Sequence, residues 1–257
     1  MEQDSELAEL LKQVAAAEGT ERAEALLGAG HRMMALGRAE EALAAVSAAR
    51  DLFALGPSSA PLPLCDHNTA VLLGLVGRDE EALEVHRRAI ELYTERFDLP
   101  EAARCSVHVA ETLRSLGRHD DALVQYEAAA EALEGQGSDE AGTCRLERSE
   151  LLVELGRFEE AHTALVAVRP GLTGCVSCVA RCAALDADAL AGLDRFAEAL
   201  AAAEEATALW DACGVDGQVT ACQLRVASLL ARTGRADAAL DRLEDLRENY
   251  RADGDAV

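Results

Sequence analysis

The chain has 257 residues, of which 24 are basic and 47 are acidic, so its formal net charge is −23 at pH 7. This charge repels phosphate backbones and anionic lipids, which argues against nucleic acid and membrane partners and favours basic or neutral proteins. The acidic start Met1-Glu2-Gln3-Asp4-Ser5 does not resemble a signal peptide, and no run approaches the roughly 20 apolar residues of a membrane span, so a cytoplasmic location is expected.

One short phrase recurs six times along the chain. Its first copy, residues 36–43, reads Leu-Gly-Arg-Ala-Glu-Glu-Ala-Leu. The central residues of the copies lie 38 to 40 positions apart and are Gly37, Gly77, Gly117, Gly156, Asp194 and Gly234. A period of this size predicts a stack of similar units rather than one closed core.

The expected elements follow from this period in chain order. An N-terminal capping helix is expected over residues 1–19, and around each phrase the apolar pattern predicts two helices joined by a short loop. The six repeats cover about 20–57, 62–99, 101–137, 139–170, 172–214 and 217–251, and a flexible tail is expected over 252–257. The fourth repeat is irregular, because Pro170-Gly171 shortens its second helix.

Each phrase combines the signals that end one helix and begin the next. The glycine is expected to end the first helix in the left-handed conformation that only glycine adopts cheaply. Arginine follows the centre in all six copies and is expected to complement the negative end of the preceding helix. Acids such as Glu40 and Glu41 come next, where they face the positive end of the second helix.

This phrase, with a small residue seven positions before its centre, resembles the tetratricopeptide repeat family over residues 20–251. A period near 40 is similar to the long-helix variant found in kinesin light chains and in many bacterial regulators. The resemblance implies an all-α, right-handed superhelical solenoid of six helix-turn-helix repeats plus an N-terminal helix. In that family the first helices line a concave groove, which typically binds an extended or helical peptide.

The resemblance also assigns candidate binding residues to the groove. They are His31, His67, Asn68, Val71, Arg104, His108, Glu111, Arg114, Glu147, Glu150, Asp188, Arg225 and Arg232. Two interpretations remain open for this mixed polar set, a solvated face and a peptide groove in which asparagine pairs with a backbone and arginine with a carboxylate. A narrower resemblance, to members that grip a peptide's C-terminal carboxylate, falls on Leu27, His31, Asn68, Arg104 and His108 and keeps only the asparagine and one cation.

The other three histidines are not expected to belong to the groove. His86, His119 and His162 fall on or near second helices, where a solvated or packed role is expected rather than a binding site.

The cysteines follow the repeat as well. Five share the column 12 positions before the centre, namely Cys65, Cys105, Cys144, Cys182 and Cys222. Contacting helices lie about 8–10 Å apart, whereas a disulfide needs Cα atoms within about 4.4–6.8 Å, so this column is expected to hold buried, unbridged thiols.

A second cysteine pattern allows more than one role. Cys175, Cys178 and Cys182 have the spacing of one helix stripe, which leaves a metal or redox role open, but no second ligand pair accompanies them. No metal or cofactor is therefore expected.

Motifs for catalysis are missing from the sequence. It contains no Gly-Lys-Ser or Gly-Lys-Thr loop, no Gly-x-Ser-x-Gly elbow and no His-Glu-x-x-His helix, so we expect a protein that is not an enzyme. The expected function is a scaffold or adaptor that binds a protein or peptide. Two alternatives remain: a peptide-responsive regulator of a separate effector chain, and a self-assembling structural protein that forms a homodimer through its C-terminal helix.

Overall fold

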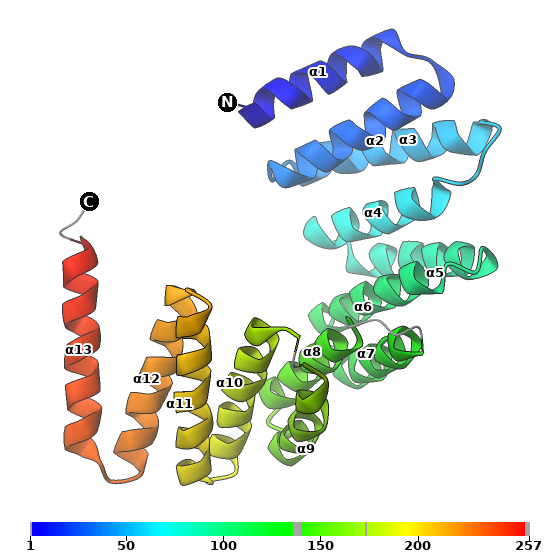
Figure 1. Ribbon diagram of the computed structural model, residues 1–257. Coiled ribbons are helices and arrows are strands. Elements are labelled where there is room, and N and C mark those ends of the chain that lie inside the picture. Colours follow the sequence, from blue (N-terminus) through cyan, green and yellow to red (C-terminus); the bar gives the residue numbers. More distant parts are fainter. Residues whose placement is uncertain (1, 136–139, 173, 255–257) are drawn as a thin grey trace. The chain divides into compact units, whose positions relative to one another are not determined.

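The computed structural model describes residues 2–135, 140–172 and 174–254, and all regular structure within these ranges is helical (Figure 1). The chain divides into two compact units, Met1–Gln136 and Gly137–Val257. Unit 1 contains α1 (Glu2–Ala16), α2 (Gly19–Ala35), α3 (Ala39–Leu55), α4 (Leu62–Leu75), α5 (Asp79–Glu95), α6 (Leu99–Ser115) and α7 (His119–Glu134). Unit 2 contains α8 (Glu140–Glu154), α9 (Phe158–Val168), a 3-10 turn (Arg169–Leu172), α10 (Val176–Gly192), α11 (Phe196–Ala212), α12 (Asp216–Arg232) and α13 (Ala236–Gly254).

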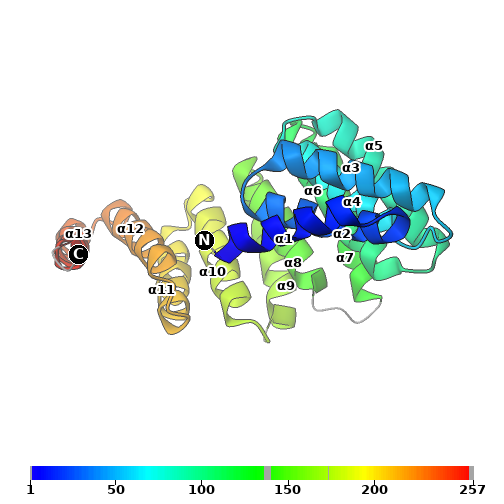
Figure 2. The ribbon, with the colours of Figure 1, turned by 90° about the horizontal axis from the view of Figure 1, so that it is seen from above.

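Within each unit the helices pair as antiparallel hairpins that follow the sequence repeat. The pairs are α2/α3, α4/α5 and α6/α7 in unit 1, and α8/α9, α10/α11 and α12/α13 in unit 2. Successive pairs of a unit also touch, for example α3 with α4 and α11 with α12, and α1 covers α2 (Figures 1 and 2). The all-α class and the six helical hairpins predicted from the phrase are thus confirmed.

The hairpin loops have the predicted left-handed residue at their centre. Gly37 has φ +73°, and Asp194, which replaces glycine in the fifth copy, adopts φ +59° at some steric cost. The next residue closes the turn, since the Arg38 N–H donates to the carbonyl oxygen of Met33 over 2.9 Å. This bond satisfies a carbonyl that the helix end would otherwise leave unpaired, and so fixes where each first helix stops.

The arginine after each centre has a different partner from the one predicted. In five of the six copies its guanidinium turns to the following helix and pairs with the acid three positions later, as Arg78 Nε and Nη2 do with Glu81 over 2.7 Å each. The same pairing joins Arg38 to Glu41, Arg118 to Asp121, Arg157 to Glu160 and Arg195 to Glu198. These pairs are exposed, so each contributes little stability, but a forked bond across the turn fixes its geometry.

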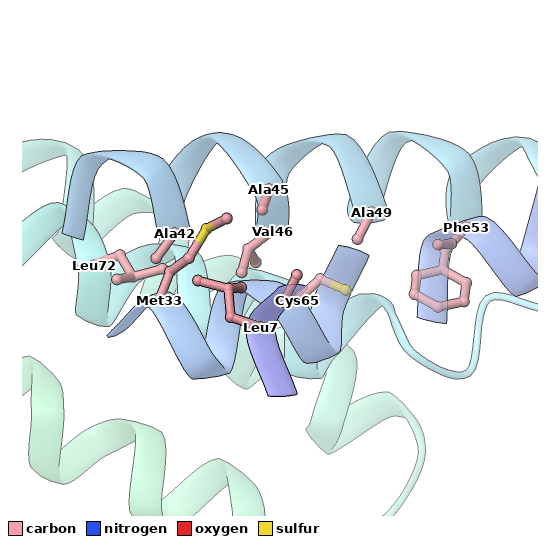
Figure 3. Close-up of a cluster of buried hydrophobic side chains, with 11 residues drawn as sticks. Leu7, Met33, Ala42, Ala45, Val46, Ala49, Phe53, Cys65 and Leu72 are labelled. Carbon is pink, nitrogen blue, oxygen red and sulfur yellow. The ribbon is translucent and has the colours of Figure 1, made fainter. Parts of the chain in front are cut away.

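Small residues let the two helices of a hairpin approach closely. In the first repeat, a Cβ on Gly30 of α2 would overlap the side chain of Val46 on α3. Larger side chains fill the space at the ends of this interface, with Phe53 at one end and Met33 and Leu72 at the other (Figure 3). Leu7 of α1 enters the same cluster and is 4% exposed, so the N-terminal helix packs against the first repeat.

The fourth repeat is irregular, as the Pro170-Gly171 pair predicted. Its second helix, α9, has 11 residues and gives way to the 3-10 turn that contains Pro170. At the other end of the chain α13 continues to Gly254, past the expected boundary at residue 251, and residues 255–257 of the predicted tail lie outside the described ranges.

Candidate functional site

The predicted groove residues all lie on the first helices of their hairpins, divided between the two units. In unit 1 they are His31 on α2, His67, Asn68 and Val71 on α4, and Arg104, His108, Glu111 and Arg114 on α6. In unit 2 they are Glu147 and Glu150 on α8, Asp188 on α10, and Arg225 and Arg232 on α12. Each unit therefore carries its own part of the predicted set.

In unit 1, two of the residues that were compared with a site gripping a peptide carboxylate bond to each other across neighbouring repeats. Asn68 is only 8% exposed, and its Nδ2 donates to His31 Nε2 over 2.7 Å. Arg104 pairs with Glu101 one turn earlier on α6. Leu27, which the same comparison included, packs against the core of the first repeat. The amide expected to hold a carboxylate is thus already engaged inside the protein.

Three histidines from three helices of unit 1 gather beside these residues. The ring centroid of His67 lies 5.0 Å from that of His108 and 5.8 Å from that of His86. His86 and His108 stack with 9° between their planes and 5.8 Å between their centroids. His86 belongs to a second helix, for which a packed or solvated role was predicted. It is packed, at 1% exposure, but it packs against two of the predicted groove residues.

Burial controls the ionisation of this cluster. Burial, reinforced by the proximity of His108, lowers the pKa of His67 from 6.5 to about 4 and that of His86 from 6.5 to about 3. Burial also raises the pKa of the Cys105 thiol to about 12, with Glu101 adding to the effect. The imidazoles of His67 and His86 and the thiol of Cys105 are consequently neutral at pH 7.

A cavity of about 280 Å³ opens next to the cluster, between α4, α5 and α6. Its lining includes Val71, His86, His108 and Glu111, three of which belong to the predicted groove set. His108 Nδ1 and Glu111 Oε2 lie 2.8 Å apart on its wall. Apolar Val71 and these polar groups give the cavity the mixed lining that is typical of a binding site.

In unit 2 all the predicted groove charges except Arg232 are paired with each other or with one arginine that the prediction missed. Arg181 of α10 bonds to Glu147 over 2.7 Å and also to Glu150, and these carboxylates raise its pKa. Arg225 Nε and Nη2 donate to Asp188 over 2.5 and 2.7 Å. Arg232 lies over the Phe196 ring, 4.1 Å from its centroid. The ion pairs of Arg181 and Arg225 link the first helices α8, α10 and α12.

The cysteine column behaves as predicted. All five of its members are buried and free. The second pattern does not form a stripe of three converging sulfurs, because Cys175 is the N-cap residue of α10 and is joined to Cys178 by a disulfide. Cys182 is separate, and its Sγ donates to the Leu165 carbonyl oxygen over 3.6 Å.

The disulfide predicts the number of reactive thiols. In denaturant without reductant, a thiol-specific reagent should titrate six thiols per chain, and eight after reduction. In a Cys175→Ser variant the count should be seven under both conditions, because Cys178 loses its partner. Eight thiols before reduction in the wild-type protein, purified under air, would contradict the assignment.

Among the described residues, no helix combines the length and apolar character that crossing a membrane requires.

Comparisons with known proteins extend the description of the fold. The family model for Soluble NSF attachment protein, SNAP, matches residues 75–169, which is less than half of the chain. No curated protein matches the chain.

Solved structures with the same fold cover between 76% and 96% of the chain. A Signal Transduction ATPase with Numerous Domains protein with a tetratricopeptide repeat sensor, from Pyrococcus horikoshii, is 13% identical with TM-score 0.80, over 96% of this chain and 40% of that one. A putative kinesin light chain with nearly identical TPR-like repeats, from Podosopora anserina, is 15% identical with TM-score 0.64, over 76% and 97%. A Rap protein complexed with Competence and Sporulation Factor is 14% identical with TM-score 0.57, over 86% and 66%.

The chain thus spans 40% of the Pyrococcus protein and 66% of the Rap protein. At such low identities the likeness concerns the fold and leaves activities and partners unassigned. The fold agrees with the six phrases and with the hairpins that they form. The chain therefore has the fold of a tetratricopeptide-type repeat protein.

Proposed function

We propose that this protein is a non-catalytic scaffold or adaptor, and that the first-helix face of unit 1 binds a peptide or an extended segment of another protein. The observation that carries the proposal is the cavity between α4, α5 and α6, which lies among the predicted groove residues and has an apolar side at Val71 and a polar side at His108 and Glu111. The Rap protein that shares this fold was solved with a second molecule bound.

The state of the charges favours unit 1 over unit 2 as the binding surface. In unit 2, Glu147, Glu150 and Asp188 are engaged by arginines of neighbouring repeats, so a partner would have to displace existing ion pairs. In unit 1, the Glu111 side chain is 51% exposed beside the cavity. With a net charge of −23, the protein attracts basic or neutral segments and repels acidic ones.

Selection from a displayed library of random peptides would test this proposal. We expect the wild-type protein to enrich basic or neutral peptides, and a Val71→Arg/Glu111→Ala variant, which places a cation in the cavity lining and removes its exposed acid, to bind the same peptides at least tenfold more weakly. Arg87→Ala serves as the matched control, because Arg87 forms an exposed pair with Glu84 on second helix α5. Equal binding by the groove variant, or no enrichment over an uncoated surface, would refute the proposal.

The regulator alternative is supported by one comparison. The Pyrococcus protein, 40% of which this chain spans, has a tetratricopeptide repeat sensor within a larger signal transduction ATPase. A peptide-responsive regulator would change the activity of a separate effector chain when a selected peptide is added, whereas a plain adaptor would not.

The self-assembly alternative depends on α13. On this helix Leu240 and Leu243 are 59% and 42% exposed, which would suit a homodimer contact. Light scattering over a concentration series distinguishes this alternative, since a homodimer doubles the measured mass and a Leu240→Glu/Leu243→Glu variant would return it to one chain.

A further inference from the structure

Three potential metal ligands come together from three successive helices of unit 1. They are His67 on α4, His86 on α5 and Cys105 on α6, and their donor atoms all lie within 4.8 Å of one another. Cys105 Sγ is 3.2 Å from His67 Nδ1. Two imidazoles and a thiol form a donor set suited to borderline and soft transition metals and unsuited to Ca²⁺ or Mg²⁺, which take oxygen ligands.

His86 is an unusual residue for its position. The equivalent residues, nine positions after the centres of the other repeats, are all apolar or aromatic: Val46, Tyr126, Leu165, Ala203 and Leu243. His86 is 1% exposed, and its Nδ1 is a buried nitrogen with no hydrogen-bond partner. A buried polar atom without a partner costs stability, so packing alone does not account for histidine here.

We propose that His67, His86 and Cys105 bind one borderline or soft transition-metal ion, of the class represented by Zn²⁺ and Cu⁺. A tetrahedral ion with bonds of about 2.0–2.1 Å to nitrogen and about 2.3 Å to sulfur separates its ligand atoms by about 3.3–3.6 Å. Cys105 and His67 already lie near this separation, and a small side-chain rotation of His86 would complete the set. Cys105 binds as the thiolate and releases its proton to water.

His108 stands beside this triad, and its bonding suits a fourth position. Its Nδ1 is bonded to Glu111, which leaves Nε2 as the nitrogen able to bind an ion. A carboxylate on the second ring nitrogen is the usual arrangement around metal-bound histidines, where it fixes the ring and its tautomer. The adjoining cavity, lined by both His86 and His108, gives an ion access from solvent.

Metal titration of the full, reduced chain would test the site. Co²⁺ serves as the spectroscopic probe for Zn²⁺, and thiolate-to-cobalt charge transfer should saturate at one ion per chain and disappear when Zn²⁺ is added. Cu⁺ is measured separately by competition with a chromophoric chelator. We expect Cys105→Ser to remove the charge-transfer band and to weaken binding at least 100-fold, and His108→Gln to weaken it less.

Cys144→Ser is the matched control, because Cys144 is a buried free cysteine in the same repeat column of unit 2. It should leave the titration unchanged. His86→Leu provides an independent readout, since leucine is the natural residue at the equivalent position 165 and the variant should fold at least as well as the wild type. Bound Zn²⁺ or Cu⁺ should raise the Tm of the wild type but not of His86→Leu.

Two outcomes would overturn the proposal. One is the absence of saturable Co²⁺, Zn²⁺ and Cu⁺ binding in the reduced wild-type protein. The other is binding that Cys105→Ser and His86→Leu leave intact, which would assign the ion to other cysteines. Since the probe is the metal alone, either result leaves the peptide-binding proposal untouched, and failure of the peptide selection leaves this one untouched.

Discussion

Replacing Asp66 with alanine should lower the free energy of unfolding by about 3 kcal/mol. Asp66 of α4 is fully buried, and its carboxylate accepts bonds from Arg50 Nε of α3 at 2.5 Å and from Arg88 Nε and Nη2 of α5 at 2.7 and 2.8 Å. Removing one partner of a buried ion pair costs about 3–5 kcal/mol, and the lower value applies here because both arginines retain contact with water. Urea denaturation followed by circular dichroism would measure the change.

A neighbouring acid provides the control for this prediction. Asp51 lies next to Arg50 on α3 but is exposed, so Asp51→Ala should change the unfolding free energy by no more than about 0.5 kcal/mol. Hydrogen exchange of Asp66→Ala should show the lost protection concentrated in α3, α4 and α5. Equal effects of the two substitutions would mean that the three-residue network does not stabilise the fold.

The same carboxylate makes stability depend on pH in a definite direction. Burial alone would raise the pKa of Asp66, but the hydrogen bonds from Arg88 and Arg50 outweigh it, so the pKa falls below its usual 3.8. The native carboxylate therefore binds protons more weakly than the unfolded one. Its contribution is fully present above about pH 4 and is lost as the pH falls through the lower native pKa, a loss that Asp66→Asn should not show.

Leu165→Ala should destabilise the protein by about 2–5 kcal/mol, the usual cost of an emptied leucine site in a core. Leu165 is 1% exposed on α9 and packs in a cluster with Leu146 of α8, Leu172 of the 3-10 turn and Cys182 of α10. It thus joins the short helix of the irregular fourth repeat to both neighbouring helices. Thermal unfolding followed by circular dichroism would report the loss.

The adjacent residue tests whether burial is the cause. Val166 follows Leu165 on α9 but is 56% exposed, so Val166→Ala should change stability by no more than about 0.5 kcal/mol. A similar loss in both variants would mean that burial does not explain the effect of Leu165→Ala; helix propensity could not explain it either, since alanine is the better helix former at both positions.

The helical hairpins were predictable because each depends on local chemistry that recurs in the sequence. A glycine that ends a helix, an acid in the next first turn and small residues at a fixed distance act within about 40 positions, and six copies reinforce one another. The irregularity of the fourth repeat followed from Pro170 in the same way, since proline removes a backbone donor wherever it stands.

The side-chain networks were harder to predict from the sequence, because they join residues from different repeats. Asp66, Arg50 and Arg88 occupy unrelated repeat positions, so no column marks their association. Arg181 was missed for a similar reason, as its partners lie on the preceding first helix. His86 did carry a signal, since it is the one histidine in a column that is otherwise apolar or aromatic, but it lies on a second helix, and the groove was predicted from first helices. Cys175 was placed inside a helix that begins one residue later.

The arginines that follow the loop centres affect how strongly the protein attracts charged molecules from a distance. Five of them form ion pairs with acids of their own turns, so five of the 24 basic side chains are neutralised by a neighbour in sequence. Since acids outnumber bases by 23, at least that many carboxylates lack a cation of their own. The resulting field guides a cationic molecule from a distance and speeds its collision with the protein in dilute electrolyte, an advantage that fades once the Debye length shrinks to about 8 Å at physiological ionic strength.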